Sequence, residues 1–379
     1  MRVVLVTHHY PRWPGDFSGA PLGALARALM RRGMSVRVVT PSEEFNDQAR
    51  LDGVTVHRVR FSRRLSQTLT DQDSFAARLN SPLRWGMLAR LWCGLKSAVR
   101  REVSAGADVV HAHSWIPAGL AAPAGVPLVV TIDGADGALL RSSRIARTLA
   151  RPLLRQATMV TTVSRPLGES IQNLAGRFVG AEHIHPLPIE SRGHPWTRGG
   201  GGAVLIGRLD GPGRVELGLE TVAVLASCGH HLPLTVIGDG PERGALQRRV
   251  QRLGISALVQ FVGAMPSDQA RSYLARADLM LVTGRGQGTA VVAHEALIAG
   301  VPVVACWDSG APVDVVPESG AGRLGLPSPQ PLADCVLSLQ ADKDRLAASR
   351  LVGEAWRTRL APDHVAQVCE GWYRGALGR

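Results

Sequence analysis

The 379-residue chain is long enough for two or three domains, each with its own hydrophobic core. Hydrophobic residues make up 45% and charged residues 20%, which is typical of a globular protein and excludes a disordered chain or a coiled coil. The formal net charge is +12, and Lys96 and Lys343 are the only lysines among 43 basic residues. We interpret the arginine excess as the codon bias of a GC-rich bacterium, although arginine also suits phosphate groups.

The first half alternates short β-branched runs with longer helical patterns. Between the first two runs, Leu22, Leu25 and Leu29 form a helical stripe that ends at Gly33, a typical helix stop after basic residues. Strand, helix and strand at this spacing predict parallel pairing with right-handed crossovers. The predicted strands cover residues 3–6, 36–39, 54–59, 108–111, 128–131 and 159–163.

Residues 81–99 carry apolar side chains at helical spacing and predict an amphipathic helix. We favour packing of this helix on the first sheet over peripheral contact with a membrane. The membrane alternative rests on basic residues that could meet anionic lipid, namely Arg84, Arg90, Lys96, Arg100 and Arg101. Nucleic-acid binding has less support, because aromatic residues are only 4% and no basic helix with base-reading residues stands out.

A second series of strands follows a glycine run, Gly199 to Gly202, which is the best linker candidate because it buries little apolar area. The chain therefore predicts two doubly wound α/β domains of Rossmann-like type, residues 1–190 and 203–358, joined by the linker 191–202. Ligands of such sheets bind beyond the carboxyl ends of the strands. The strands predicted in the second half cover residues 203–206, 234–237, 259–262, 279–282 and 303–305.

The passage after the strand 203–206 carries two arginines, Arg208 and Arg214, beside a glycine-rich turn. Guanidinium groups at the end of a strand suit a diphosphate, whose charge must be neutralised when it leaves.

The densest signal is residues 283–305, in which a strand ends, a glycine-rich turn follows and a helix begins near Thr289. The amides of the first helical turn are unpaired donors that favour a phosphate. Glu295 lies about two turns further along, where a carboxylate can accept both hydrogen bonds of a ribose diol. The alternative is a solvated helix glutamate without a role.

Cysteine usage and the apolar runs predict a cytoplasmic protein. The five cysteines include no CxxC pair, which favours reduced thiols over a disulfide scaffold or a zinc site. The apolar run at the start of the chain is too short for a signal peptide. Prolines interrupt the longest uncharged stretch, residues 115–132, so it predicts a helix, a turn and a strand instead of a membrane span.

Taken together, the motifs resemble glycosyltransferase family 4, the retaining, metal-independent sugar transferases of the GT-B fold. The resemblance covers nearly the whole chain, and the order of the motifs is more specific than any one of them. In the second half it rests on Gly207-Arg208-Leu209, Val236-Ile237-Gly238-Asp239-Gly240-Pro241, Phe261-Val262-Gly263, Ala277-Asp278-Leu279 and Gly300-Val301-Pro302-Val303-Val304-Ala305. In the first half it rests on Gly19, Asp108-Val109-Val110-His111-Ala112-His113 and Thr161-Thr162-Val163-Ser164. The end of the chain, residues 359–379, resembles the last helix of the family, which crosses back to the first domain. That likeness rests on Pro362-Asp363-His364 and Trp372-Tyr373.

The resemblance implies a nucleotide sugar bound mainly by the second domain and a small-molecule acceptor bound mainly by the first, across a cleft that closes. It implies that Arg208 holds the diphosphate and Glu295 the ribose. The remaining implied donor contacts are the backbone of Gly288, Thr289 and Ala290 on phosphate, Gly263 to Met265 beside the base, and Gly19 approaching the phosphate from the other domain. No metal or other cofactor is implied.

Three departures from the family pattern mark this chain. Gln287 replaces the first of two glutamates and is expected to bind the hexose. Gly213 replaces a lysine, whose role we assign to Arg214 on the diphosphate. Asp133 replaces a histidine beside the reacting carbon, where it could orient the acceptor or take its proton. The alternative for Asp133 is a structural turn aspartate before Gly134.

The sequence gives little support to a metal site or to a dehydrogenase. His8-His9, His111-Ala112-His113, His183-Ile184-His185 and His230-His231 lack a third ligand at a zinc-like spacing, and a strand-borne HxH pair is usually packing. The first strand leads into a loop without GxGxxG, which argues against a dehydrogenase.

The sequence therefore predicts a glycosyltransferase that uses a nucleotide sugar, first for a small natural-product acceptor and second for a cell-envelope lipid or sugar. A nucleotide-sugar epimerase and a non-catalytic sugar-nucleotide sensor are the alternatives. The nucleotide base, the sugar, the accepting atom and the oligomeric state stay open.

Overall fold

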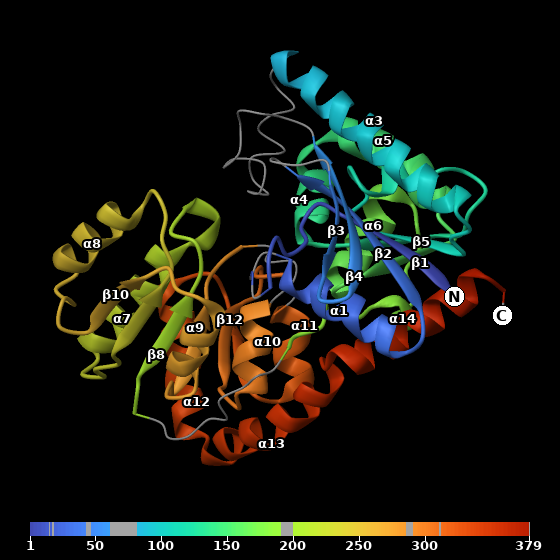
Figure 1. The fold of residues 1–379 in the computed structure, drawn as a ribbon. Coiled ribbons are helices and arrows are strands. Elements are labelled where there is room, and N and C mark those ends of the chain that lie inside the picture. Colours follow the sequence, from blue (N-terminus) through green and yellow to red (C-terminus); the bar gives the residue numbers. More distant parts are fainter. Residues whose placement is uncertain are drawn as a thin grey trace. The chain divides into compact units, whose positions relative to one another are not determined.

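The computed structural model describes residues 1–14, 16, 19–42, 47–60, 82–190, 200–285, 291–310 and 312–378. The chain divides into two compact units, Met1–Glu190 with Leu360–Arg379 and Ser191–Arg359, and each is built around its own sheet (Figure 1). Within the described part of the chain, no helix has the length and apolarity to cross a membrane.

The first unit contains a seven-stranded sheet in the order β3-β4-β2-β1-β5-β6-β7. Neighbouring strands are parallel except for β3 and β4. All six strands predicted for this half are present, and their central residues are mostly buried, as expected for strands covered on both faces. Their bounds are β1 (Arg2–Thr7), β2 (Ser35–Ser42), β4 (Val54–Arg60), β5 (Val109–His113), β6 (Leu128–Ile132) and β7 (Met159–Thr162).

Strand β3 (Asp47–Leu51) was not predicted, because its sequence lacks β-branched residues. It pairs antiparallel with β4 as a hairpin. Asp52 and Gly53 form the turn with φ values of 48° and 83°, the left-handed conformation that tight hairpin turns require. The chain thus reaches β4 through a hairpin, although β4 still lies parallel to β2.

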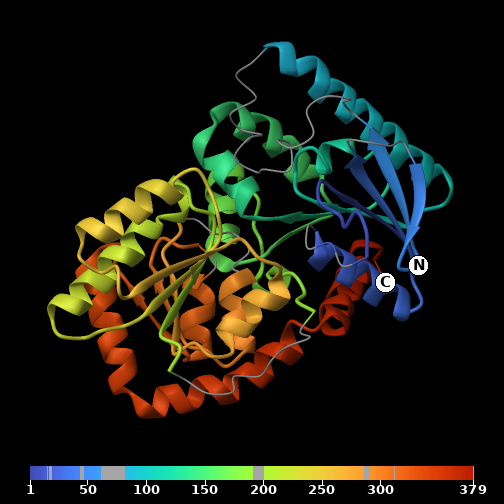
Figure 2. The ribbon, with the colours of Figure 1, turned by 60° about the vertical axis from the view of Figure 1, so that its left-hand side comes forward.

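Helices cover both faces of this sheet. Figure 2 shows α1 (Ala20–Arg31) beside α14 (Pro362–Ala376), and the two share one hydrophobic cluster with the sheet. As predicted, α1 ends just before Gly33, whose φ is 82°. The opposite face is covered by α3 (Pro82–Ser104), α4 (Gly134–Ser142), α5 (Arg144–Gln156) and α6 (Arg165–Ala175), with short turns η1 (Gly119–Ala121) and η2 (Ala181–His183) nearby.

Helix α3 contributes one face to the core of the first unit. Its residues Leu91, Leu95 and Val99 are buried in the hydrophobic cluster of the first unit. The described part of this helix therefore packs on the sheet, as we favoured.

The second unit contains a six-stranded, fully parallel sheet in the order β10-β9-β8-β11-β12-β13. The five strands predicted for this half are all present: β8 (Ala203–Ile206), β9 (Leu234–Ile237), β10 (Val259–Gly263), β11 (Leu279–Val282) and β12 (Val303–Cys306). Edge strand β13 (Gly322–Gly325) was not predicted, because two glycines and one arginine among its four residues do not form an apolar, β-branched run.

The helices of the second unit are α7 (Val215–Ser227), α8 (Arg243–Arg252), α9 (Ser267–Leu274), α10 (Val291–Ile298), α11 (Pro312–Ser319), α12 (Pro329–Ala341) and α13 (Lys343–Arg359), with the short turn η3 (Gly211–Gly213) before α7. Helix α13 packs along α10 and α12, and α7 and α12 pack together in the main hydrophobic cluster of this unit.

Candidate functional site

The strand order of the second sheet reverses at β8, with β9 and β10 on one side and β11 to β13 on the other. Ligands of open α/β sheets bind at such a reversal, outside the carboxyl ends of the strands. The loops after β8 and β11 meet there through two hydrogen bonds. The Arg285 amide donates to the Pro212 carbonyl at 2.9 Å, and the Thr283 hydroxyl donates to the Gly213 carbonyl at 3.2 Å.

Arg208 lies in the loop after β8, at the carboxyl end of the strand. Its guanidinium contacts Asp210 Oδ2, at 2.6 Å from Nη2 and 2.8 Å from Nε. Asp210 also accepts the Gly213 amide at 3.1 Å, so it orders the turn that leads into α7. Because 51% of the Arg208 side chain is exposed, an anion at this strand end can reach it.

Glycines allow the neighbouring loops to approach one another at this edge. Gly238 follows β9 with φ at 142°, and a Cβ there would overlap the Gly207 carbonyl oxygen. A Cβ on Gly240 would likewise collide with the Leu209 carbonyl. Gly238 and Gly240 therefore serve the close packing of backbone around the loop of Arg208.

Arg214 is the residue that enters α7, and it adopts a left-handed conformation with φ at 43°. Its Nε donates to the Thr283 carbonyl at 2.8 Å. Its two Nη atoms bind both oxygens of Asp308 at 2.6 and 2.9 Å, and Arg285 Nε lies 3.3 Å from the same carboxylate. Burial favours a raised pKa for Asp308, but the hydrogen bonds and charges of the two arginines outweigh it and lower the pKa.

Glu295 on α10 is not a solvated glutamate. Only 9% of its side chain is exposed, and its Oε1 accepts Arg271 Nη2 from α9 at 3.0 Å. Burial raises the pKa of Glu295, and the charge and hydrogen bond of Arg271 oppose that rise. Arg271 also holds Asp268 at 2.8 Å, so it bridges two carboxylates.

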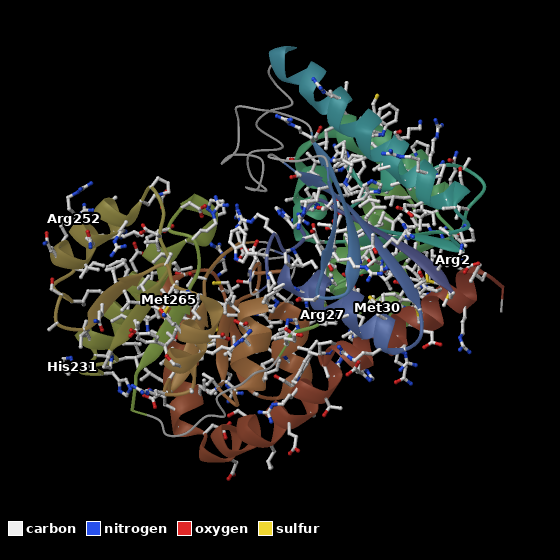
Figure 3. All side chains as sticks on the ribbon, viewed as in Figure 1. Arg2, Arg27, Met30, His231, Arg252 and Met265 are labelled. Atoms are coloured by element: carbon white, nitrogen blue, oxygen red, sulfur yellow. The ribbon has the colours of Figure 1, made fainter. Side chains whose placement is uncertain are left out.

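Four predicted donor residues, Gln287, Gly288, Thr289 and Ala290, lie outside the described residues. Helix α10 is described from Val291. Two further predicted residues lie at the end of β10 and in the loop after it. Gly263 has φ at 83°, which favours glycine, and Met265, labelled in Figure 3, is half-buried in the loop before α9.

The first sheet reverses at β1, since β2 lies on one side and β5 on the other. Gly19 lies just before α1, in the loop that follows β1. Its φ is 72°, and a Cβ would stand 2.6 Å from Tyr10 Cα and 2.7 Å from the His9 carbonyl. Both the conformation and the close approach therefore require glycine at this position.

The HxH pair on β5 has a structural use in this unit. His111 Nδ1 lies 2.8 Å from the Tyr373 hydroxyl of α14, and Nε2 lies 2.7 Å from Thr131 Oγ1. The His111 and His113 rings are 4.2 Å apart on one sheet face, and burial lowers the pKa of His113 to about 3. Among the described residues, no group of three or more histidine, cysteine or acidic side chains could hold a metal ion.

Asp133 directly follows β6 and precedes α4. Its Oδ1 accepts the Asp136 amide at 3.1 Å, while Asp136 Oδ2 lies 3.4 Å from the Asp133 amide. This reciprocal pattern is a capping box for α4. Asp136 is buried and also binds Ser114 Oγ at 2.7 Å and the Trp115 amide at 3.3 Å. Asp133 thus has the structural role that we considered as an alternative, and that role does not exclude a chemical one.

Three residues that contact the predicted site residues, two in the second unit and one in the first, were not predicted from the sequence. Asp308 is 94 positions from Arg214, and Arg271 is 24 positions from Glu295, so no local pattern marked these two pairings. Asp136 did leave a signal, because an acidic residue three positions after a helix-capping aspartate is the spacing of a capping box.

Comparison with known proteins identifies both halves of the chain. Residues 2–190 match the model of a glycosyl transferase 4-like domain, and residues 202–342 match that of glycosyl transferases group 1. Together with the two parallel-sheet units, these matches define a glycosyltransferase of the GT-B fold. The chain belongs to the family-4 type of these enzymes.

Individual relatives show how broad this family is. The chain is 25% identical to a putative teichuronic acid biosynthesis glycosyltransferase, TuaC, of Bacillus subtilis, over 82% of each chain. It is also 25% identical to the 2-deoxystreptamine glucosyltransferase of Streptomyces kanamyceticus, over 74% of this chain and 80% of that protein. HepE of Anabaena, solved in complex with UDP, has the same fold, with a TM-score of 0.67, 18% identity and coverage of 98% of this chain and 99% of that one.

Proposed function

We propose that this glycosyltransferase moves a sugar from a nucleoside-diphosphate sugar to a small acceptor, with retention of configuration and without a metal ion. The observation that carries the donor assignment is the position of Arg208 and Arg214 in the loop at the strand reversal of the second sheet. A departing diphosphate gains negative charge, and preorganised guanidinium groups stabilise that charge most effectively. These arginines would supply the positive charge that magnesium supplies in metal-dependent transferases.

Arg208 and Arg214 are expected to contribute differently to diphosphate binding. Arg208 is the more exposed of the two and can contact the diphosphate directly. Arg214 is bound on both Nη atoms by Asp308, so a diphosphate would share this guanidinium with a carboxylate. We assign direct binding to Arg208 and a supporting role to Arg214, aided by the backbone amides of Gly288, Thr289 and Ala290.

Glu295 suits the nucleoside part of the donor. Arg271 occupies Oε1 and favours the charged carboxylate, which can still accept hydroxyl groups of a ribose. In the same scheme Gln287 contacts the hexose, and Gly263 to Met265 flank the base. The UDP complex of HepE supports a nucleoside diphosphate as the ligand of this fold.

The first unit would bind the acceptor. Asp133 lies at the carboxyl end of β6, where a carboxylate can orient an acceptor hydroxyl or take its proton. Gly19 lies in the loop after β1, at the reversal point of the same sheet, and would approach the donor phosphate.

Two acceptor classes have support. A small natural-product scaffold is our first choice, and the similarity to the 2-deoxystreptamine glucosyltransferase favours it. A cell-envelope sugar or lipid is the second, and the similarity to TuaC favours that.

The test is a panel of nucleotide sugars offered with aminocyclitol, macrolide and lipid acceptors, with products identified by mass spectrometry. Transfer to a soluble scaffold in the presence of EDTA is the expected result. Turnover of lipid acceptors alone would reject the natural-product assignment, and loss of turnover in EDTA would reject the metal-free one.

The donor site is tested separately by calorimetry with several nucleoside diphosphates. We expect Arg208→Ala to weaken binding about tenfold or more, the value of a charge-assisted hydrogen bond. Arg248→Ala on α8, an exposed arginine of the same unit, is the matched control and should bind normally.

A further inference from the structure

Helix α5 exposes large apolar side chains on the outside of the first unit. Its start is sharply defined, because the Ser143 hydroxyl accepts the Ala146 amide at 3.2 Å. The buried residues on one side of the helix pack in the hydrophobic cluster between the helices and the sheet of the first unit. Ile145 is nevertheless 72% exposed and Leu149 is 50% exposed.

The spacing of these residues shows that the helix has two apolar stripes. Ala146, Ala150 and Leu154 recur every four residues and form the buried stripe. Ile145 and Leu149 also lie four apart and form a second stripe, next to the exposed Pro152. The burial of the first stripe already accounts for the packing of α5, so the second stripe needs a separate explanation.

The surface around this second stripe is strongly basic. The segment 137–181 contains seven arginines and one acidic residue, Glu169. On α5, Arg144, Arg151 and Arg155 are exposed and share one side of the helix, beside the apolar stripe. Among the described residues, the side-chain hydrogen bonds of Arg147 and Arg151 go to backbone carbonyls and not to carboxylates, so these charges are not neutralised.

A third exposed apolar side chain lies near the other end of the helix. Arg177 Nη2 lies 3.3 Å from the Ala157 carbonyl and 3.4 Å from that of Thr158, which fastens the loop after α6 to the end of α5. The next residue, Phe178, is 71% exposed. Large apolar side chains thus project near both ends of a basic helix.

We propose that the exposed side of α5, defined by Ile145, Leu149 and the arginine row Arg144, Arg151 and Arg155, is a docking surface for an anionic lipid bilayer. Aliphatic side chains beside a row of arginines are the pattern of a helix that lies in the membrane interface, with its apolar stripe among the acyl chains and its guanidinium groups at lipid phosphates. The sequence raised membrane contact only for residues 81–99, and there as the alternative that we did not favour. Leu91, Leu95 and Val99 of that helix are buried and its Trp92 is 37% exposed, whereas α5 exposes Ile145 and Leu149 more fully.

A nucleic acid or an acidic protein is a different partner for the same charge. Either would use the arginines, but neither needs two exposed aliphatic side chains in the middle of the basic surface. The apolar stripe therefore favours lipid, and it provides the test that separates the partners.

The experiment is co-sedimentation of the full chain with vesicles, in the absence of any sugar donor, so that its result does not depend on the proposed transfer. We expect binding to phosphatidylglycerol–phosphatidylcholine vesicles, little binding to pure phosphatidylcholine, and weakening as salt screens the arginines. The double variant Ile145→Ser with Leu149→Ser, and the triple variant with Arg144, Arg151 and Arg155 each changed to Gln, should each lower the partition coefficient about tenfold or more.

The second unit offers matched controls. Leu351→Ser removes an 80% exposed leucine from α13, and Arg248→Gln with Arg252→Gln removes two exposed charges from α8, of which Arg252 is labelled in Figure 3. Both controls should bind vesicles like the unchanged protein, and thermal melts should show that all variants stay folded.

Two outcomes would overturn the proposal. One is the absence of vesicle binding at low salt. The other is binding that needs the arginines but survives the Ile145 and Leu149 changes, or that an oligonucleotide matches equally well, which would assign the surface to a soluble polyanion.

Discussion

Asp133 and Asp136 each bind the backbone amide of the other, at 3.1 Å and 3.4 Å, at the start of α4. Asp136 also contacts the Ser114 hydroxyl, and that contact has a consequence for its protonation. The single proton of Ser114 has two possible acceptors, the Ile116 carbonyl at 2.6 Å and Asp136 Oδ1 at 2.7 Å. A carbonyl can only accept, so both contacts are satisfied when Asp136 is protonated and donates to Ser114.

The environment favours that neutral form. Burial and the nearby Asp133 charge raise the pKa of Asp136 well above its usual value, despite hydrogen bonds that act in the opposite direction. Ser114 has φ at 99°, a conformation that residues other than glycine rarely adopt, and the hydrogen bond to Asp136 helps to hold it.

The first prediction concerns Asp136 and pH. Because its folded pKa lies above the unfolded value of about 3.9, this group favours folding at low pH, and its contribution is lost as pH rises towards the folded pKa. Asp136→Asn copies the protonated acid and does not titrate. As the pH rises above about 4, its free energy of unfolding in urea titrations should therefore fall less steeply than that of the unchanged protein, by at most the slope of one titrating group.

Asp136→Ala is the contrasting variant, because it removes the donor to the Ser114 oxygen and leaves the Trp115 and Asp133 amides without their acceptor. We expect a loss of about 1–3 kcal/mol. Equal pH slopes for the unchanged protein and Asp136→Asn would show that Asp136 is ionised in the folded state.

The second prediction separates the capping role of Asp133 from the chemical one. Serine is a good helix cap but not a base, so Asp133→Ser should keep the melting temperature close to that of the unchanged protein. If Asp133 activates the acceptor, kcat should fall by about 10²–10⁴ while nucleoside-diphosphate affinity stays the same. Steady-state kinetics and calorimetry measure the two quantities, and an unchanged kcat would leave Asp133 as a cap alone.

The third prediction concerns the left-handed backbone of Arg214. Arg214→Gly and Arg214→Ala remove the same guanidinium, but only glycine adopts a φ of 43° without strain. The alanine variant should be less stable than the glycine variant by about 1 kcal/mol in chemical denaturation.

Both Arg214 variants should bind nucleoside diphosphate equally weakly, since they lack the same charge. If Arg214→Gly bound as tightly as the unchanged protein, the arginine would serve only to tie the start of α7 to Asp308.

The fourth prediction concerns the pH dependence of donor binding. Arg271 opposes the burial that raises the pKa of Glu295. In Arg271→Gln that pKa should rise further, so the affinity for a nucleoside diphosphate should decline at a higher pH than in the unchanged protein. Calorimetry across pH 5 to pH 8 would detect the shift.

Asp268→Asn is the matched control for this experiment, because the Asp268 charge favours a higher pKa for Glu295. Its removal should move the binding profile in the opposite direction. Profiles that coincide for both variants would mean that Glu295 does not contact the ribose.

The sequence alone predicted the strands of the two sheets and the loop that carries Arg208. Eleven strands were predicted, and all eleven are present, because burial on both faces imposes continuous β-branched runs that are visible locally. The position of Arg208 at a strand end followed from the same pattern. Strands β3 and β13 were not predicted, because their polar or glycine-rich sequences do not favour a strand by themselves. They form strands by pairing with the free edges of β4 and β12.

Tertiary structure alone decided which charges meet. Arg214 and Asp308 are 94 positions apart, and Arg271 and Glu295 lie on different helices, so their pairing depends on the order of strands in the sheet. It also decided that α5 keeps Ile145 and Leu149 exposed beside its arginines, whereas Leu91, Leu95 and Val99 of α3 are buried. Periodicity reports that a helix has an apolar face, but only packing determines how much of that face the rest of the protein covers.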